Sequence, residues 1–374
     1  MSKLLKIILT LVVCFMFIGS LGTAPRAQAA PNIPPQLQQV ISKDGNAVGI
    51  TAAGDQTAAT LSYWTLERQQ AAKPLEVKIS SADLNSMTSA DSTGPAVMKP
   101  GGMGDPAAVE AAQAKYPDAF AAADKIRSES RQPSLKMPSL VDPTGTKNVG
   151  DLYDGNWYTA FYTTYPYRTI GKLFFDDGVY GYSCTAAMIS DNNIIVTSAH
   201  CIYNTDYNFW YQHWLYVPAY FYGVAPLGTY GWSSATVNVA WQTAKSSSKG
   251  AALDVGLIHL GGNPAGLYGY MGWGYNWNAK NLRTKIGYAS NWFTGSETWI
   301  CHSESYTKGS LIADGCPINN TAGGSPSILF YYPYLGGGYN WVDAVVFGNA
   351  DAFNIQSTRF TNKNILTICA IAGC

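Results

Sequence analysis

The stretch from Cys184 to Cys201 reads CTAAMISDNNIIVTSAHC, and the fold prediction starts from it. Small and apolar residues come first, a polar turn follows at 190–193, and an apolar run over 194–197 precedes His200. Short apolar runs separated by a polar turn predict two strands joined by that turn. The two cysteines are then expected side by side, next to a histidine.

This stretch resembles the TAAHC region of the chymotrypsin-like (trypsin-like) serine peptidases. In that family a disulfide ties the histidine's loop to the preceding strand, and the histidine is the general base. The resemblance therefore implies a Cys184–Cys201 bond and a catalytic role for His200. A lone histidine near a strand end is more often structural, but here it follows Thr-Ser-Ala and precedes a cysteine.

Composition limits the classes of partner. The chain has 374 residues, Lys+Arg and Asp+Glu balance at 24 each, and 13% of residues are charged. No basic field for nucleic acid is present, so nucleic acid is not expected as a partner. The length allows one large domain or two to three ordinary ones.

The first residues have the order of a secretory signal peptide. Lys3 and Lys6 precede an apolar run over 7–21, and Ala27-Gln28-Ala29 follows as an A-x-A cleavage site. A membrane anchor is the alternative, but the run is short for a span and no second run of that kind follows. We expect a signal peptide over 1–29 and a secreted, extracellular protein with no membrane association after cleavage.

Cysteine usage fits an exported chain. Once Cys14 leaves with the signal, an even number of cysteines remains, which indicates disulfides. Their spacing suggests the pairs 184–201, 301–316 and 369–374, although other pairings are open. The cysteines concerned are Cys184, Cys201, Cys301, Cys316, Cys369 and Cys374. None forms a CxxC pair, so a zinc site has no support and no metal site is expected.

The chain divides by composition near residue 150. Residues 30–150 hold only four aromatic residues among many Ala, Ser, Pro and Gly, and predict a poorly structured pro-segment or linker. Within it, 106–127 is rich enough in Ala for a helix interrupted at Pro117. A disordered spacer is the alternative to a removable pro-segment, whose cleavage is expected between about 127 and 150.

Residues 151–374 consist of short apolar or aromatic runs separated by Gly, Asn, Ser and Pro. Examples are 169–175, 214–217, 235–241 and 255–260. Such runs predict an all-β sandwich or barrel. The family resemblance implies two six-stranded antiparallel β-barrels, split near 255–275.

Acyl transfer by a serine needs a base near the hydroxyl, a carboxylate that orients the base, and amides that bind the oxyanion. The family supplies His, Asp and Ser in that order. Leu253-Asp254-Val255 resembles its aspartate followed by an apolar strand. The resemblance implies that Asp254 orients His200, and an acid buried there needs such a partner. A turn aspartate before the strand is the alternative.

The nucleophile motif departs from the family's GDSGGP or GNSGSP, because the chain reads TAGGSPS at 321–327. One register makes Ser325 the nucleophile, with the Gly323 and Ser325 amides as the oxyanion hole. The other places Gly323 where the serine belongs and leaves no nucleophile. We favour Ser325, because that register keeps a chemically complete triad.

Other stretches also resemble secreted bacterial members of the family and their glutamyl-endopeptidase-like branch. They are 165–173, 217–220 with 225–228, 286–289 with 299–301, and 358–361. Substrate preference is not readable. Asn319 stands where trypsin has an acid, and 345–349 lacks the histidine of the glutamyl branch. His213, His259 and His302 are expected to be structural.

The sequence thus predicts a secreted serine endopeptidase that hydrolyses peptide bonds as a monomer, without a cofactor, on a protein or peptide substrate. One alternative is a catalytically inactive peptidase homologue that acts as an extracellular binding protein. Another is a carbohydrate-binding surface built from the abundant Trp and Tyr, for which an aromatic barrel core is the simpler explanation.

Overall fold

The computed structural model describes residues 37–53, 56–75, 77, 94–129, 162–244, 248–290, 295–308, 311–316, 323–333, 335, 338–351 and 354–374. The predicted signal peptide at 1–29 lies outside these residues, as does nearly all of the predicted cleavage region. Within the described ranges, no helix is both long and apolar enough to span a membrane.

The first sheet contains most strands of the N-terminal half. Its members are β1 (Leu37–Ile41), β2 (Ala47–Ala52), β3 (Lys73–Pro74), β5 (Ile170–Asp176), β6 (Gly181–Ser190), β7 (Ile194–Thr197), β10 (Gln212–Pro218), β11 (Trp232–Asn238) and β12 (Gly256–Leu260). The second sheet contains β4 (Val97–Lys99), β13 (Gly272–Tyr275), β14 (Leu282–Gly287), β15 (Trp299–Lys308), β16 (Leu311–Asp314), β17 (Pro326–Leu329), β18 (Trp341–Asp351) and β19 (Asn354–Arg359). A small separate pair is formed by β8 (Tyr203–Asn204) and β9 (Phe209–Trp210).

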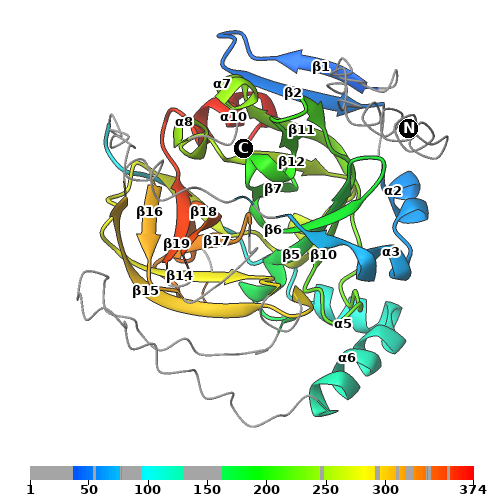
Figure 1. The fold of residues 1–374 in the computed structure, drawn as a ribbon. Coiled ribbons are helices and arrows are strands. Elements are labelled where there is room, and N and C mark those ends of the chain that lie inside the picture. The colour runs from blue at the N-terminus through cyan, green and yellow to red at the C-terminus, as the bar shows by residue number, and fades with distance from the viewer. Residues whose placement is uncertain are drawn as a thin grey trace, which may run out of the picture. The chain divides into compact units, whose positions relative to one another are not determined.

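Helices are short and connect or flank the sheets (Figure 1). They are α2 (Thr57–Tyr63), α3 (Leu66–Ala71), α5 (Ala108–Lys115), α6 (Pro117–Glu129), α7 (Val239–Ala244), α8 (Ser248–Ala251), α9 (Pro264–Tyr268) and α10 (Ile365–Ala372), with 3-10 turns η1 (Tyr167–Thr169) and η2 (Ala199–Cys201). The predicted helix over 106–127 is present as α5 and α6. Pro117 begins α6, where its missing N–H and fixed φ are tolerated.

Six strands of the first sheet form an antiparallel barrel in the order β11-β12-β7-β6-β5-β10. Tyr216 of β10 and Tyr230, just before β11, close the barrel by exchanging backbone hydrogen bonds of 2.8 and 2.9 Å. The stretch from Cys184 to Cys201 supplies most of β6 and all of β7, and the turn between them lies at 191–193, within the predicted 190–193.

The second barrel repeats this order. Strands β18-β19-β16-β15-β14-β17 correspond one by one to those of the first barrel, and β17 pairs with β18 to close the ring. All six pairings are antiparallel. Two closed six-stranded barrels with one shared strand order make the chymotrypsin-like fold, so the predicted fold class is confirmed.

An apolar core joins the two barrels. One cluster of buried side chains contains Phe174 and Val196 from the first barrel and Ile286 and Val342 from the second. Each of these four side chains is fully or almost fully excluded from solvent. Because burial of apolar area is the main stabilising contribution, the barrels are expected to unfold together.

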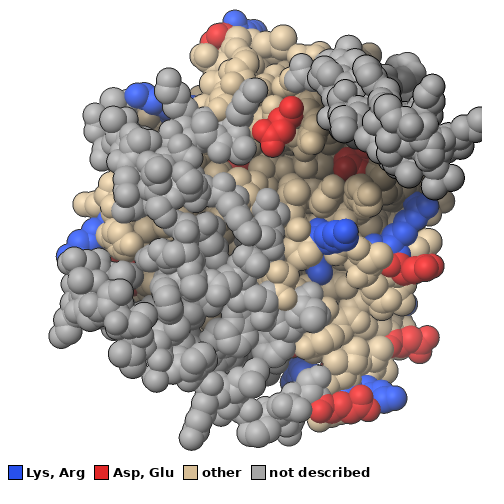
Figure 2. Space-filling model, viewed as in Figure 1, with Lys and Arg blue, Asp and Glu red and all other residues tan. Residues whose placement is uncertain are grey.

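The second barrel also buries charge. Arg283 of β14 binds Asp343 of β18 through Nη2 and Oδ2 at 2.6 Å, and both side chains are almost fully buried. Lys285 and Asp314 form a second buried ion pair. On the face shown in Figure 2, by contrast, the Lys, Arg, Asp and Glu of the described residues are interspersed and form no single-sign patch.

The N-terminal stretch differs from its prediction as a poorly structured segment. Its described part is built into the fold, because β2 pairs with β11 over five residue pairs and extends the first sheet (Figure 1). Val48 and Ile50 of β2 are buried, and Trp64 packs on Phe174 and donates Nε1 to the His213 carbonyl at 2.6 Å. Composition did not predict this ordered strand, because β2 is held by pairing with the free edge of β11, which is distant in sequence.

Two ionisable side chains are buried where the barrels meet. Lys172 of β5 donates Nζ to the Gly295 carbonyl at 2.7 Å, and burial lowers its pKa to about 8. Glu297 is 4% exposed, and burial raises its pKa to about 7 against the opposing effect of a hydrogen bond from Tyr222. Glu297 is therefore protonated in the folded protein over a range where an unfolded glutamate is ionised.

We predict that stability falls as pH rises between about 4.5 and about 7, because in that window the unfolded state releases a proton that folded Glu297 keeps. Glu297→Gln removes this contribution and flattens that part of the profile. Urea unfolding midpoints of both proteins across this range measure it. Identical pH profiles for the two proteins would contradict the assignment.

Candidate active site

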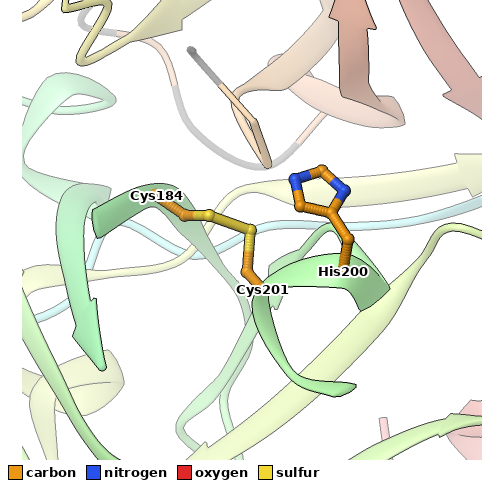
Figure 3. A group of neighbouring side chains, drawn as sticks. All are labelled: Cys184, His200 and Cys201. Atoms are coloured by element: carbon orange, nitrogen blue, oxygen red, sulfur yellow. A yellow bond between two sulfur atoms is a disulfide. The ribbon is translucent and has the colours of Figure 1, made fainter. Parts of the chain in front are cut away.

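His200 lies in the 3-10 turn η2, directly after strand β7. The Cys184–Cys201 disulfide joins this turn to β6, as Figure 3 shows, and closes a loop with a sequence separation of 17. The bond restricts the turn that carries the imidazole. His200 itself is 5% exposed.

Asp254 lies just before β12 and is fully buried. Its Oδ1 accepts the His200 backbone N–H at 2.7 Å, and its Oδ2 lies 2.7 Å from His200 Nδ1. A carboxylate oxygen only accepts, so Nδ1 carries the proton and the lone pair of the neutral ring is on Nε2. The sequence prediction that Asp254 lies beside His200 agrees with this geometry, which is that of an oriented general base.

Gly323 is the residue that faces the basic nitrogen. A Cβ built on Gly323 would lie 2.7 Å from His200 Nε2. Nε2 is buried and has no hydrogen-bond partner among the described residues. The position from which a nucleophile would reach the base is thus held by a residue without a side chain.

Ser325, the nucleophile predicted from the sequence, does not place its hydroxyl at His200. Its side chain is fully buried, and its Oγ has no hydrogen-bond partner among the described residues, so it does not bond to His200. The Oγ lies against Gly287 of β14, where an added Cβ would be 1.8 Å away. The predicted oxyanion hole of the Gly323 and Ser325 amides is not supported by this geometry, because it assumed that Ser325 attacks the substrate.

Backbone pairing explains this register. Gly324 donates its N–H to the Val346 carbonyl at 2.9 Å, and the Val346 N–H returns to the Ser325 carbonyl at 2.9 Å. The Gly323 carbonyl accepts the Thr185 N–H of β6 at 2.9 Å. Gly324 has φ +79° and no room for a side chain, because an added Cβ would lie 2.2 Å from the Thr185 carbonyl oxygen. These contacts, from both barrels, fix residues 323–325.

The cluster of Cys184, His200 and Cys201 has the residue types of a metal site. Its two sulfur atoms form a disulfide, so it offers no thiolate to a metal (Figure 3). The other two disulfides join Cys301 to Cys316 and Cys369 to Cys374. All three pairs are those that the spacing suggested.

The remaining histidines bind other partners. His213 Nδ1 lies 2.7 Å from Asp176 Oδ2, and its ring stacks on Tyr63. His259 bonds with the Ser233 hydroxyl and His302 with that of Thr284. Burial lowers the pKa of both His259 and His302. None of these contacts involves the candidate site.

A segment of the N-terminal stretch lies next to Gly323, which was not predicted from the sequence. The Leu75 carbonyl oxygen lies 3.7 Å from the Cβ position of Gly323. No local signal in the sequence pointed to this contact. For Gly323 the sequence did contain a signal. The second register of the TAGGSPS stretch places Gly323 at the family's nucleophile position and matches the family's residues after that position.

Solved structures of proteases are similar to this chain. Protease Anisep from Arthrobacter nicotinovorans has 17% identity and a TM-score of 0.49, over 55% of this chain and 95% of that chain. The thermostable serine protease AL20 from an extremophilic microorganism has 17% and 0.49, over 55% and 97%. A Glu endopeptidase in complex with MPD has 18% and 0.48, over 60% and 99%. No protein-family profile matches the chain, and no curated protein matches it in sequence.

We predict that replacing both Cys184 and Cys201 by Ala lowers the free energy of unfolding by about 3 kcal/mol, because a bond across 17 residues restricts the unfolded chain. The pair Cys369 and Cys374, with a separation of 5, serves as the control and should lose about 2 kcal/mol when replaced by Ala. Urea unfolding gives both values. A larger loss for the control pair would refute the loop-closure account.

Proposed function

We propose that this chain is an exported protein of the serine-peptidase type whose site takes a polypeptide segment beside His200 and does not form an acyl-enzyme. The observation that carries the proposal is the pairing of an oriented base with a glycine. His200 Nδ1 is bound to Asp254 at 2.7 Å, and Nε2 faces Gly323. Three disulfides fit a protein that works in an oxidising compartment.

The chemistry follows from what each residue provides. Acyl transfer needs a hydroxyl or thiol within hydrogen-bond reach of the base. Gly323 supplies none, and Ser325 Oγ lies against Gly287 instead. A site that lacks one triad member keeps only about 10³–10⁴-fold acceleration over water, which is far below that of a working peptidase. Binding of polypeptide is therefore the activity that this geometry supports best.

A second candidate is the serine endopeptidase predicted from the sequence, with Ser325 as nucleophile. The complete and buried His200–Asp254 pair favours it, because that pair has the geometry of a general base. It requires residues 323–325 to leave their hydrogen bonds with Val346 and Thr185, so that the Ser325 hydroxyl reaches Nε2. Both candidates share a polypeptide as ligand and differ in the nucleophile.

Fluorophosphonate labelling of the full chain separates the two candidates. Incubation lasts hours, so that local opening of the segment around Leu75 exposes the site. We expect no label on the wild type and a label at position 323 in Gly323→Ser, which adds a hydroxyl next to Nε2. A Cβ at 2.7 Å from Nε2 requires a small shift of the ring or the segment.

Three variants serve as controls. Gly323→Ala introduces the same steric contact without a hydroxyl and should stay unlabelled. Combining Gly323→Ser with His200→Ala should abolish the label, because the base is gone. A label on the wild type that maps to Ser325 and disappears in Ser325→Ala would reject the proposal in favour of the endopeptidase.

A further inference from the structure

The covering segment consists of Lys73, Pro74, Leu75 and Val77. It begins as strand β3, which pairs in parallel with Tyr182 and Ser183 of β6. The Leu75 N–H donates to the Ser183 carbonyl at 3.1 Å. The opposite edge of β6 is bonded to β5 over this range, so β3 occupies the edge that β5 leaves open.

That edge of β6 leads into the candidate active site. Ser183 bonds to the covering segment, and two residues later the Thr185 N–H donates to the Gly323 carbonyl. The Leu75 carbonyl oxygen is 3.7 Å from the Cβ position of Gly323. The covering segment therefore lies next to the residue that faces His200.

The segment then reaches the second barrel. The Val77 carbonyl oxygen would lie 2.3 Å from a Cβ built on Gly348 of β18, so only a glycine allows this approach. The Val77 side chain packs against a buried apolar cluster of Ala251, Leu311 and Phe347. Backbone pairing at one end and an aliphatic anchor at the other are the two contributions found when a peptide adds to a sheet edge.

We propose that the surface between Ser183 of β6 and Gly348 of β18 is a binding site for an extended polypeptide with an aliphatic side chain, and that the covering segment is its resident occupant. The ligand pairs with β6 through its backbone and places its aliphatic side chain on Phe347. An external peptide binds only when the resident segment leaves. This proposal rests on the polypeptide-binding part of the proposed function, because it names the kind of polypeptide that the site takes.

Attachment to the same chain explains why an external ligand is excluded. A tethered segment has an effective concentration in the millimolar range, so a free peptide at micromolar concentration does not displace it. Weakening the resident segment should open the site. Val77→Asp does so by bringing a charge to the apolar cluster of Ala251, Leu311 and Phe347.

The test measures binding of a fluorescent synthetic peptide with the sequence of residues 70–80 to full-length chains by anisotropy. We expect at least about tenfold tighter binding to Val77→Asp than to the wild type. Val179→Asp is the matched control, because Val179 is 76% exposed and lies outside the covering segment. Adding Gly348→Ala to Val77→Asp should remove binding again, since its Cβ fills the place of the peptide carbonyl.

A second readout is the rate at which diethyl pyrocarbonate modifies His200, mapped by mass spectrometry, with half-buried His213 as internal reference. The rate at His200 should rise in Val77→Asp and not in Val179→Asp. Each chain must keep the wild-type near-UV circular dichroism, and Val77→Gly replaces Val77→Asp if it does not. Equal peptide binding and equal His200 rates in wild type and variant would overturn the proposal.

These results are independent of the nucleophile question. If the wild type labels at Ser325 while Val77→Asp gains peptide binding, the non-acylating function fails and the resident-segment proposal stands. If the labelling results agree with the proposed function but Val77→Asp gains neither peptide binding nor His200 reactivity, only the resident-segment proposal fails.

Discussion

The fully buried carboxylate of Asp254 is the constraint on which the candidate site depends. A buried charge is destabilising unless hydrogen bonds replace its hydration, and here one residue, His200, supplies them through its backbone and its ring. That arrangement requires β12 to begin beside the η2 turn. Gly256, the first residue of β12, has no space for a Cβ between Ile202 and Ala199. The Asp254 carboxylate therefore holds β12, the η2 turn and the His200 imidazole in one arrangement.

The opposite side of the site is fixed by the second barrel in a different way. Residues 323–325 bond to Val346 of β18 and to Thr185 of β6, so both barrels determine which residue faces His200. Buried ion pairs such as Arg283–Asp343 link strands of the barrel that holds this segment. Moving the Ser325 hydroxyl to His200 Nε2 would break the backbone pairing with Val346. The flexibility of the neighbouring glycines is therefore not enough to bring this hydroxyl to the base.

Short-range patterns predicted much of this architecture. The two apolar runs and the polar turn within 184–201 predicted two strands and their connection, and Pro117 marked the boundary between two helices. The placement of Asp254 beside His200 followed from the family resemblance. The nucleophile position did not follow, because the TAGGSPS stretch fits the family motif in part in two registers that are two residues apart. The backbone pairing with Val346 decides between them. The role of β2 was likewise hidden, since its partner β11 is distant in sequence.

The pairing of β2 with β11 changes what proteolytic processing can achieve. A cut in the predicted cleavage region, between about 127 and 150, would separate the chain into two pieces, yet β2 would remain hydrogen-bonded in the first barrel's sheet, with Val48 and Ile50 buried. Trp64 adds a further buried anchor. The N-terminal piece would then stay bound as a subunit of a two-chain protein, and under the proposed occupancy only the short stretch around Leu75 would have to detach to expose His200.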